Sequence, residues 1–138
     1  MKKEQIHTII RNTGLKVTPK RVSILKVIIA SKRPLTIQRL LSLLPEMDQV
    51  TTYRTLESFV QFGVVRQVDF RHGHAHYEFV EKNNDHHHLV CTVCKKVEDF
   101  TDCTVTKLME QIVKKSKSFT SINDHTLELF GVCSSCKE

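Results

Sequence analysis

Two pairs of cysteines with identical spacing are the residues of this 138-residue chain best suited to chemistry. Cys91 and Cys94 form one C-x-x-C motif, and Cys133 and Cys136 form another, with 38 residues between the two motifs. Four thiolates turned toward one point complete the tetrahedral sulfur shell that Zn²⁺ prefers. A pair of dithiol redox motifs is the alternative, but the βαβ pattern that usually surrounds such motifs is missing. We therefore predict a structural zinc site, with Cys103 left to pack as a small apolar residue.

A run of imidazoles comes directly before the first cysteine pair. Residues 85–88 read Asp-His-His-His and lead into an apolar pair. In an extended segment, His86 and His88 share one face, whereas Asp85 and His87 share the other. Further nitrogen and oxygen ligands are available from Glu78, Asp99 and His125. Mixed shells of this kind suit exchangeable Fe²⁺, Mn²⁺, Zn²⁺ or Ni²⁺, so we predict at least one metal site besides the zinc site.

The elements that must position these ligands begin with helices in the first half of the chain. Apolar residues recur at helical spacing over residues 3–13, 18–31, 36–44 and 49–62. Thr18 and Thr36 are suitable N-caps, and Gly63 is a suitable stop for the last helix. Two short β-like runs follow at residues 64–70 and 75–80. Helices followed by a hairpin predict a winged helix-turn-helix, whose last helix enters the major groove of DNA.

The helix at residues 49–62 carries the candidate DNA contacts. Its first turns place the hydroxyls of Thr52 and Tyr53 and the guanidinium of Arg54 where base edges and phosphates would lie. Val50 and Tyr53 also fit the apolar stripe of a core-facing helix, in which case Arg54 would be an ordinary surface charge.

Charge supports a division of the chain near residue 80. Residues 1–80 hold 13 Lys and Arg against 6 Asp and Glu, whereas residues 81–138 hold 8 against 9. The basic first part indicates a polyanionic partner. A helix expected at residues 104–117 has one apolar face, which suits packing or dimerisation. No apolar run approaches the roughly 18 residues of a membrane span, and the first residues lack the apolar core of a signal peptide. We therefore expect a cytoplasmic protein with no membrane partner.

At this point the sequence resembles the ferric uptake regulator (Fur) family over essentially its whole length. The resemblance rests on Leu15-Lys16-Val17-Thr18, on Thr52-Tyr53-Arg54-Thr55-Leu56, on the segment HHHLVCTVC at residues 86–94, on Val97-Glu98-Asp99-Phe100, and on Cys133 and Cys136. It implies an α+β homodimer that acts as a metal-responsive transcriptional repressor and not as an enzyme. A winged helix-turn-helix domain at residues 1–80 would bind an inverted-repeat operator in double-stranded DNA. An α/β domain at residues 81–138 would bind metal and dimerise.

The resemblance also implies roles for individual residues. The structural Zn²⁺ would be held by Cys91, Cys94, Cys133 and Cys136. A regulatory metal between the domains would be held by Glu78, His86, His88 and Asp99. A second metal site would use Asp85, His87 and His125, although Thr106 stands where a carboxylate is common. DNA would be contacted by Lys16 in the minor groove and by Thr52, Tyr53 and Arg54 on the recognition helix.

One departure from the family concerns the regulatory site. Many members add a histidine from the loop after the second helix, but residues 31–34 of this chain read Ser-Lys-Arg-Pro. The hairpin offers His72, His74 and His76 instead. We expect His76 to complete the shell, because it lies two residues before Glu78 and so on the same strand face.

The family resemblance also ranks the candidate signals that the protein would sense. We expect Fe²⁺ first as the regulatory metal, with Mn²⁺ and Zn²⁺ as the other candidates. Peroxide sensing through bound iron comes second, because Asp99 resembles the peroxide-sensing branch of the family. Zinc sensing comes third. Two other classes are a metal-dependent hydrolase, for which no general base is identifiable, and a zinc-ribbon adaptor for RNA or protein.

Overall fold

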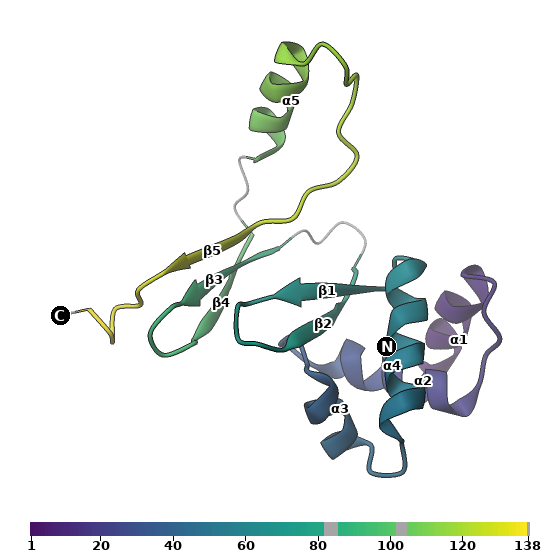
Figure 1. The fold of residues 1–138 in the computed structure, drawn as a ribbon. Coiled ribbons are helices and arrows are strands. Elements are labelled where there is room, and N and C mark those ends of the chain that lie inside the picture. Colours follow the sequence, from purple (N-terminus) through teal and green to yellow (C-terminus); the bar gives the residue numbers. More distant parts are fainter. Residues whose placement is uncertain (82–85, 102–104, 138) are drawn as a thin grey trace. The chain divides into compact units, whose positions relative to one another are not determined.

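The computed structural model describes residues 1–81, 86–101 and 105–137 (Figure 1). The chain forms two compact units, Met1–Val80 and Glu81–Glu138, which we call the N-terminal unit and the C-terminal unit. Within the described ranges, none of the helices combines the length and hydrophobicity that a membrane crossing needs.

The N-terminal unit begins with helices whose ends are set by local sequence. These are α1 (Lys3–Asn12), α2 (Pro19–Ala30), α3 (Ile37–Leu43) and α4 (Gln49–Gln61). The side chains of Thr18, Thr36 and Asp48 each accept the backbone N–H three residues later and so cap α2, α3 and α4. Gly63 has a φ of +72°, a conformation that suits glycine after the end of α4.

A β-hairpin follows α4 directly. Strands β1 (Val65–Asp69) and β2 (Ala75–Phe79) pair antiparallel, with Arg66 opposite Glu78 and Val68 opposite His76. Gly73 allows the turn between them with a φ of +80°. A bridge between Leu35 and Tyr77 ties the hairpin to the segment that links α2 and α3. The predicted order of helices followed by a hairpin is therefore observed.

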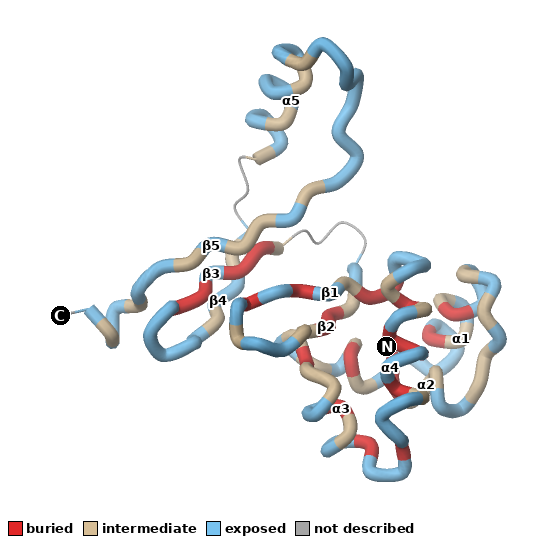
Figure 2. The backbone as a smooth tube through the Cα atoms, in the orientation of Figure 1, coloured by how far each residue is buried: buried red, intermediate tan, exposed pale blue. Residues whose placement is uncertain are grey.

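The core of the N-terminal unit joins all of these elements. Figure 2 shows buried positions on each helix and on both strands of the hairpin. The fully buried side chains include Ile6, Ile10, Ile24, Leu25, Leu40, Leu56 and Phe59. Val50 and Tyr53, which fit the apolar stripe of α4 in the sequence, are 58% and 47% exposed. The core is instead completed on α4 by Thr52 and Thr55, so the start of this helix presents a different face to solvent from the one that the apolar stripe suggests.

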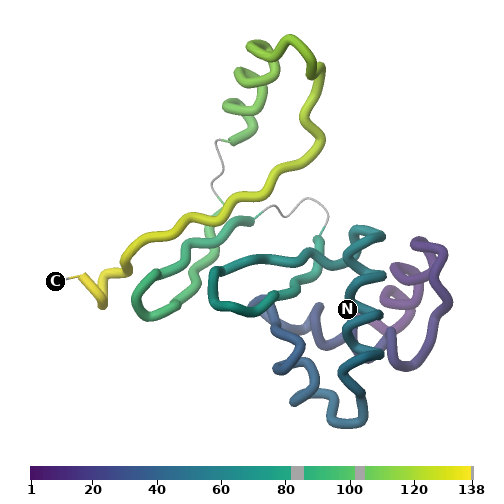
Figure 3. The backbone as a smooth tube through the Cα atoms, in the orientation of Figure 1, coloured from purple at the N-terminus to yellow at the C-terminus, as the bar shows by residue number. Residues whose placement is uncertain are grey.

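The C-terminal unit is built on a small sheet. Strands β3 (His87–Cys91), β4 (Val97–Phe100) and β5 (Glu128–Gly131) lie in the order β4-β3-β5, with β4 antiparallel and β5 parallel to β3. Helix α5 (Val105–Lys115) lies between β4 and β5 in the chain, and Figure 3 follows the path from α5 back to β5. A parallel strand needs such a long crossover connection. None of the described residues of α5 is buried.

Candidate metal centre and nucleic-acid interface

The two C-x-x-C motifs lie at the ends of paired strands. Cys91 is the last residue of β3, and the chain turns through Cys94 and Lys95 before β4 begins. Lys95 has a φ of +68° in this turn, and its N–H donates to the carbonyl of Cys91. Cys133 follows β5, which is paired with β3. The sheet therefore brings cysteines that are distant in sequence to the same end.

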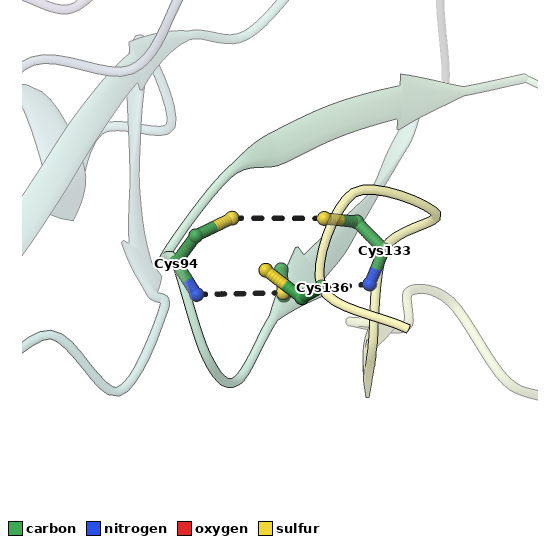
Figure 4. Close-up of side chains that lie close together, drawn as sticks. Cys94, Cys133 and Cys136 are labelled. Atoms are coloured by element: carbon green, nitrogen blue, oxygen red, sulfur yellow. Dashed lines mark hydrogen bonds between the residues drawn. The ribbon is translucent and has the colours of Figure 1, made fainter. Parts of the chain in front are cut away.

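The four sulfur atoms form one cluster. Cys91, Cys94, Cys133 and Cys136 each offer a sulfur, and all four lie within 4.8 Å of one another. The sulfurs of Cys94 and Cys133 are 3.7 Å apart, and Figure 4 shows the labelled sulfurs turned toward one another. Ligands about 2.3 Å from a central zinc ion in a tetrahedron would be about 3.8 Å apart. The donor set and its spacing therefore fit a closed thiolate site.

Hydrogen bonds shift the pKa values of two thiols of this cluster in opposite directions. The sulfur of Cys91 accepts the backbone N–H groups of Cys133 at 3.4 Å and of Cys94 at 3.5 Å. These bonds lower the pKa of the Cys91 thiol to about 6. Hydrogen bonding with the thiols of Cys133 and Cys94 raises the pKa of Cys136 to about 12. Without a cation the cluster favours a mixture of thiolate and thiol, so a bound zinc ion would displace protons as well as order the two turns.

The sheet also fixes the surroundings of His88, the central residue of a cross-strand row. His88 on β3 is paired with Asp99 on β4 and with Glu128 on β5. Its Nε2 lies 3.7 Å from Oδ1 of Asp99, and its Nδ1 lies 3.7 Å from Oε1 of Glu128. The His88 side chain is 1% exposed, compared with 50% for Asp99 and 22% for Glu128. His88 and Asp99, both predicted ligands, are thus neighbours in one sheet.

The other histidines of this segment alternate between the two faces, as an extended chain requires. The rings of His86 and His88 are 5.1 Å apart, centre to centre. His87 lies on the opposite face, where its Nε2 is 3.2 Å from Nε2 of His125. Asp85, the third residue predicted for that second site, lies outside the described residues. Thr106 is exposed on α5.

Glu78 and His76 lie on β2 of the N-terminal unit. The buried Glu78 accepts hydrogen bonds from Arg66, its partner on β1, with Nε of Arg66 at 2.9 Å from Oε1 and Nη2 on the same oxygen. The centre of the His76 ring lies 4.8 Å from the ring centre of Phe70 and 5.4 Å from that of His72. Burial lowers the pKa of His76, so its imidazole favours the neutral form that metal ligands require.

The first turns of α4 present a polar surface. Tyr53 and Arg54 are exposed, as is Lys16 in the turn before α2, where the guanidinium of Arg21 donates to the carbonyl of Lys16 at 2.6 Å. Thr52 is different, because it is 1% exposed and its hydroxyl donates to the carbonyl of Asp48. The core takes the side of α4 that carries Thr52, so the structure does not present this predicted DNA contact to solvent.

Three residues near these sites were missed in the sequence. Glu128 lies between two leucines at 127 and 129, and a lone acid in an apolar strand is a signal that could have found it. Arg66 is twelve residues from Glu78 and meets it only through the hairpin register. Asp48 comes directly before the helix predicted from residue 49 but was not identified as its N-cap, a role that it fills by accepting the N–H of Thr51 at 2.8 Å.

Comparison with known proteins finds relatives that match nearly the whole chain. The ferric uptake regulator family matches residues 12–130 of the chain. The peroxide-responsive repressor PerR of Staphylococcus saprophyticus is 29% identical over 135 residues, which cover 95% of this chain and 88% of that protein. The ferric uptake regulation protein of Legionella pneumophila is 28% identical over 133 residues, covering 93% and 96%. The structure of the ferric uptake regulator from Pseudomonas aeruginosa with manganese has a TM-score of 0.80 at 30% identity and covers 94% of this chain and 98% of that one.

These matches confirm the predicted α+β fold, with an N-terminal helical DNA-binding part and a C-terminal α/β part that holds a four-cysteine cluster. The match extends over most of the chain. This protein therefore belongs to the ferric uptake regulator family of metal-dependent, DNA-binding transcription regulators, which are not enzymes.

Proposed function

We propose that the protein is a repressor whose operator affinity is controlled by a regulatory metal ion, with Fe²⁺ as its first candidate. The ion would be held by Glu78, His86, His88 and Asp99, and His76 is the candidate for a further ligand. The observation that carries this proposal is the pairing of His88 with Asp99 across adjacent strands, 3.7 Å apart at their nearest ring nitrogen and carboxylate oxygen. Imidazole and carboxylate together suit an exchangeable divalent ion, in contrast to the closed thiolate cluster.

Ligands contributed by both units would couple the metal to DNA. Glu78 belongs to the N-terminal unit, and His86, His88 and Asp99 belong to the C-terminal unit. An ion bound by all four would restrict the angle between the units. If only one angle lets both recognition helices of a dimer reach successive major grooves, metal and operator must strengthen each other's binding reciprocally.

Arg66 would limit the affinity of this site. Its guanidinium already donates to Oε1 of Glu78. A divalent ion on Glu78 would meet a fixed positive charge beside it, and it would compete with Arg66 for the carboxylate. Arg66 would thus keep the ion exchangeable.

The four-cysteine cluster would hold structural Zn²⁺. A four-coordinate thiolate shell is saturated, so it can anchor the turn after β5 against β3 but offers no open position for exchange. The second site would use His87 and His125, whose nearest nitrogens are 3.2 Å apart, together with Asp85.

Operator recognition would involve Lys16, Tyr53 and Arg54. All three are exposed, and the N-terminal unit carries the excess of Lys and Arg. Family members bind DNA operators as dimers. Helix α5 supports a homodimer here, because Leu108 and Ile112 are 52% and 51% exposed on its apolar face.

Peroxide sensing through bound iron is the second candidate for the signal. Two observations favour it. The carboxylate that β4 places opposite His88 is Asp99, which resembles the peroxide-sensing branch of the family. Relatives from Staphylococcus saprophyticus and Bacillus subtilis are named as a peroxide-responsive repressor and a peroxide operon regulator. Zinc sensing is third. Fe²⁺ remains the first candidate for the regulatory metal, because iron sensing and peroxide sensing through bound iron both require it.

Substitution of the paired histidines tests the proposal. Replacing His86 and His88 by Ala should abolish the effect of added Mn²⁺ on operator affinity and leave the zinc content unchanged. His7→Ala, on α1, is the control. The proposal is wrong if the double variant still binds operator more tightly with metal than without it, to the same degree as His7→Ala.

A further inference from the structure

His88 lies between two carboxylates, and only one of them has a role in the proposed metal site. Nε2 faces Asp99 and Nδ1 faces Glu128, each at 3.7 Å. Both neighbours are fixed by strand register, since Asp99 and Glu128 are the cross-strand partners of His88 on its two sides. The arrangement therefore belongs to the sheet itself and does not depend on a loop.

A neutral imidazole has one nitrogen that carries a proton and one that can bind a metal ion. If Nε2 takes the ion beside Asp99, the proton must lie on Nδ1, which faces Glu128. A carboxylate stabilises an N–H that points toward it, and in this way it fixes both the tautomer and the orientation of a metal-binding histidine. The distance of 3.7 Å between Nδ1 and the Glu128 carboxylate is longer than a hydrogen bond, so the attraction between them is electrostatic.

Burial makes this effect stronger. The His88 side chain is 1% exposed, so water does not provide an alternative partner for its ring nitrogens. The Glu128 side chain is 22% exposed, so solvent screens its charge less than it would screen a fully exposed carboxylate. The neighbouring pair on the same sheet, Leu89 with Glu98, has an exposed acid that faces no imidazole ring in the cross-strand row.

We infer that Glu128 is a positioning residue for the regulatory metal. It holds His88 with the proton on Nδ1 and presents Nε2 to the ion, without itself entering the ligand shell. This inference rests on the proposed function, because it takes His88 and Asp99 as ligands.

The test compares two substitutions that remove the same charge from the same sheet. Zinc-loaded full-length Glu128→Gln and Glu98→Gln are titrated with Mn²⁺, and free Mn²⁺ is followed by its electron paramagnetic resonance signal. Glu128→Gln should weaken Mn²⁺ binding roughly ten- to a hundredfold, as loss of a carboxylate partner of a ligand does. Glu98→Gln should match the unsubstituted protein, and Glu128→Asp should recover part of the loss.

A second measurement separates positioning from general stability. Long-range ¹H–¹⁵N spectra of the imidazoles should show His88 with its proton on Nδ1 in the unsubstituted protein, and a mixture of tautomers in Glu128→Gln. The zinc content and the thermal midpoint should be the same in both glutamine variants.

The outcomes are distinguishable. Equal Mn²⁺ affinity of the two glutamine variants, with His88→Ala unable to bind Mn²⁺, would overturn the inference and leave the proposed function standing. Unchanged Mn²⁺ affinity in His88→Ala would overturn the proposed site itself. Loss of all Mn²⁺ binding in Glu128→Gln, with an altered absorption spectrum of bound Co²⁺, would make Glu128 a ligand and would also overturn the positioning role.

Discussion

The two units bury very different amounts of apolar surface. Among the described residues, the buried apolar side chains lie in the N-terminal unit, apart from Val90 and Cys91. The buried polar residues of the C-terminal unit are His87 and His88, both candidate metal ligands. Helix α5 buries none of its described residues.

This difference indicates two sources of stability. Burial of apolar side chains stabilises the N-terminal unit whether or not metal is present. The C-terminal unit has a small sheet and little core among its described residues, so on the proposed function metal ions and a second copy of the chain would supply much of its stability. On the proposed function, the unit that needs metal for stability would also be the one that metal controls.

Loss of structural zinc should have the largest effect on this contrast. Cys133→Ser should remove zinc and unfold the C-terminal unit, because a structural zinc site contributes on the order of 10 kcal/mol. Zinc content and amide hydrogen exchange measure this, with protection lost on β3 and β5 and kept on α2 and α4. Cys103→Ser, outside both cysteine pairs, is the control. Protected β5 amides in zinc-free protein would contradict the account.

A cavity in the apolar core should instead destabilise the N-terminal unit. Phe59→Ala should cost about 3–5 kcal/mol, because Phe59 is fully buried on α4. Phe62→Ala, at a residue that is 47% exposed, should cost less than about 1 kcal/mol. Urea unfolding of zinc-loaded protein gives both values. Equal effects of the two substitutions would show that the core does not stabilise the N-terminal unit as described.

The apolar face of α5 tests the contribution of a second chain. Ile112→Asp should weaken dimerisation roughly tenfold or more, since it places a charge on an apolar face that is expected to be buried in the dimer. Gln111→Asp introduces the same side chain at the adjacent residue. Sedimentation equilibrium measures the two dissociation constants, and identical values would remove α5 from the interface.

The smallest effect is expected at the N-cap of α4. Hydrogen bonds from Thr51 lower the pKa of Asp48 below its usual 3.8. The folded state binds this proton less readily than the unfolded state, so the cap stabilises the N-terminal unit above about pH 3.8 and is lost as pH falls through the lowered pKa. Asp48→Asn should make thermal stability less dependent on pH below 4, because the amide oxygen caps without ionising. An unaltered pH profile between pH 2 and 4 would count against this cap.

The sequence was most informative where structure is set locally. Thr18 and Thr36 cap helices as predicted, and the C-x-x-C motifs form the predicted cluster. The alternation of His86, His87 and His88 follows from the geometry of an extended chain.

What the sequence did not predict depends on strand register and on packing. Glu128 meets His88 only because β5 pairs parallel with β3, and Arg66 meets Glu78 only because of the hairpin register. Thr52 was placed on the DNA side because periodicity does not show which face of α4 the core takes. Side-chain periodicity identifies an apolar stripe on a helix, but the packing of neighbouring elements determines which face of the helix is buried.

Operator binding as a function of metal tests the central claim most directly. Zinc-loaded protein would be used with a duplex that it selects from random-sequence DNA in the presence of Mn²⁺. At one fixed salt concentration, affinity is measured without added metal and with Fe²⁺ under anaerobic conditions, Mn²⁺, Zn²⁺ and Ni²⁺. The account predicts that Fe²⁺ or Mn²⁺ raises affinity by roughly 5- to 150-fold, the usual range of such coupling. Loss of this gain after peroxide in the Fe²⁺ sample alone would select peroxide sensing. Equal operator affinity with and without every metal would contradict the account.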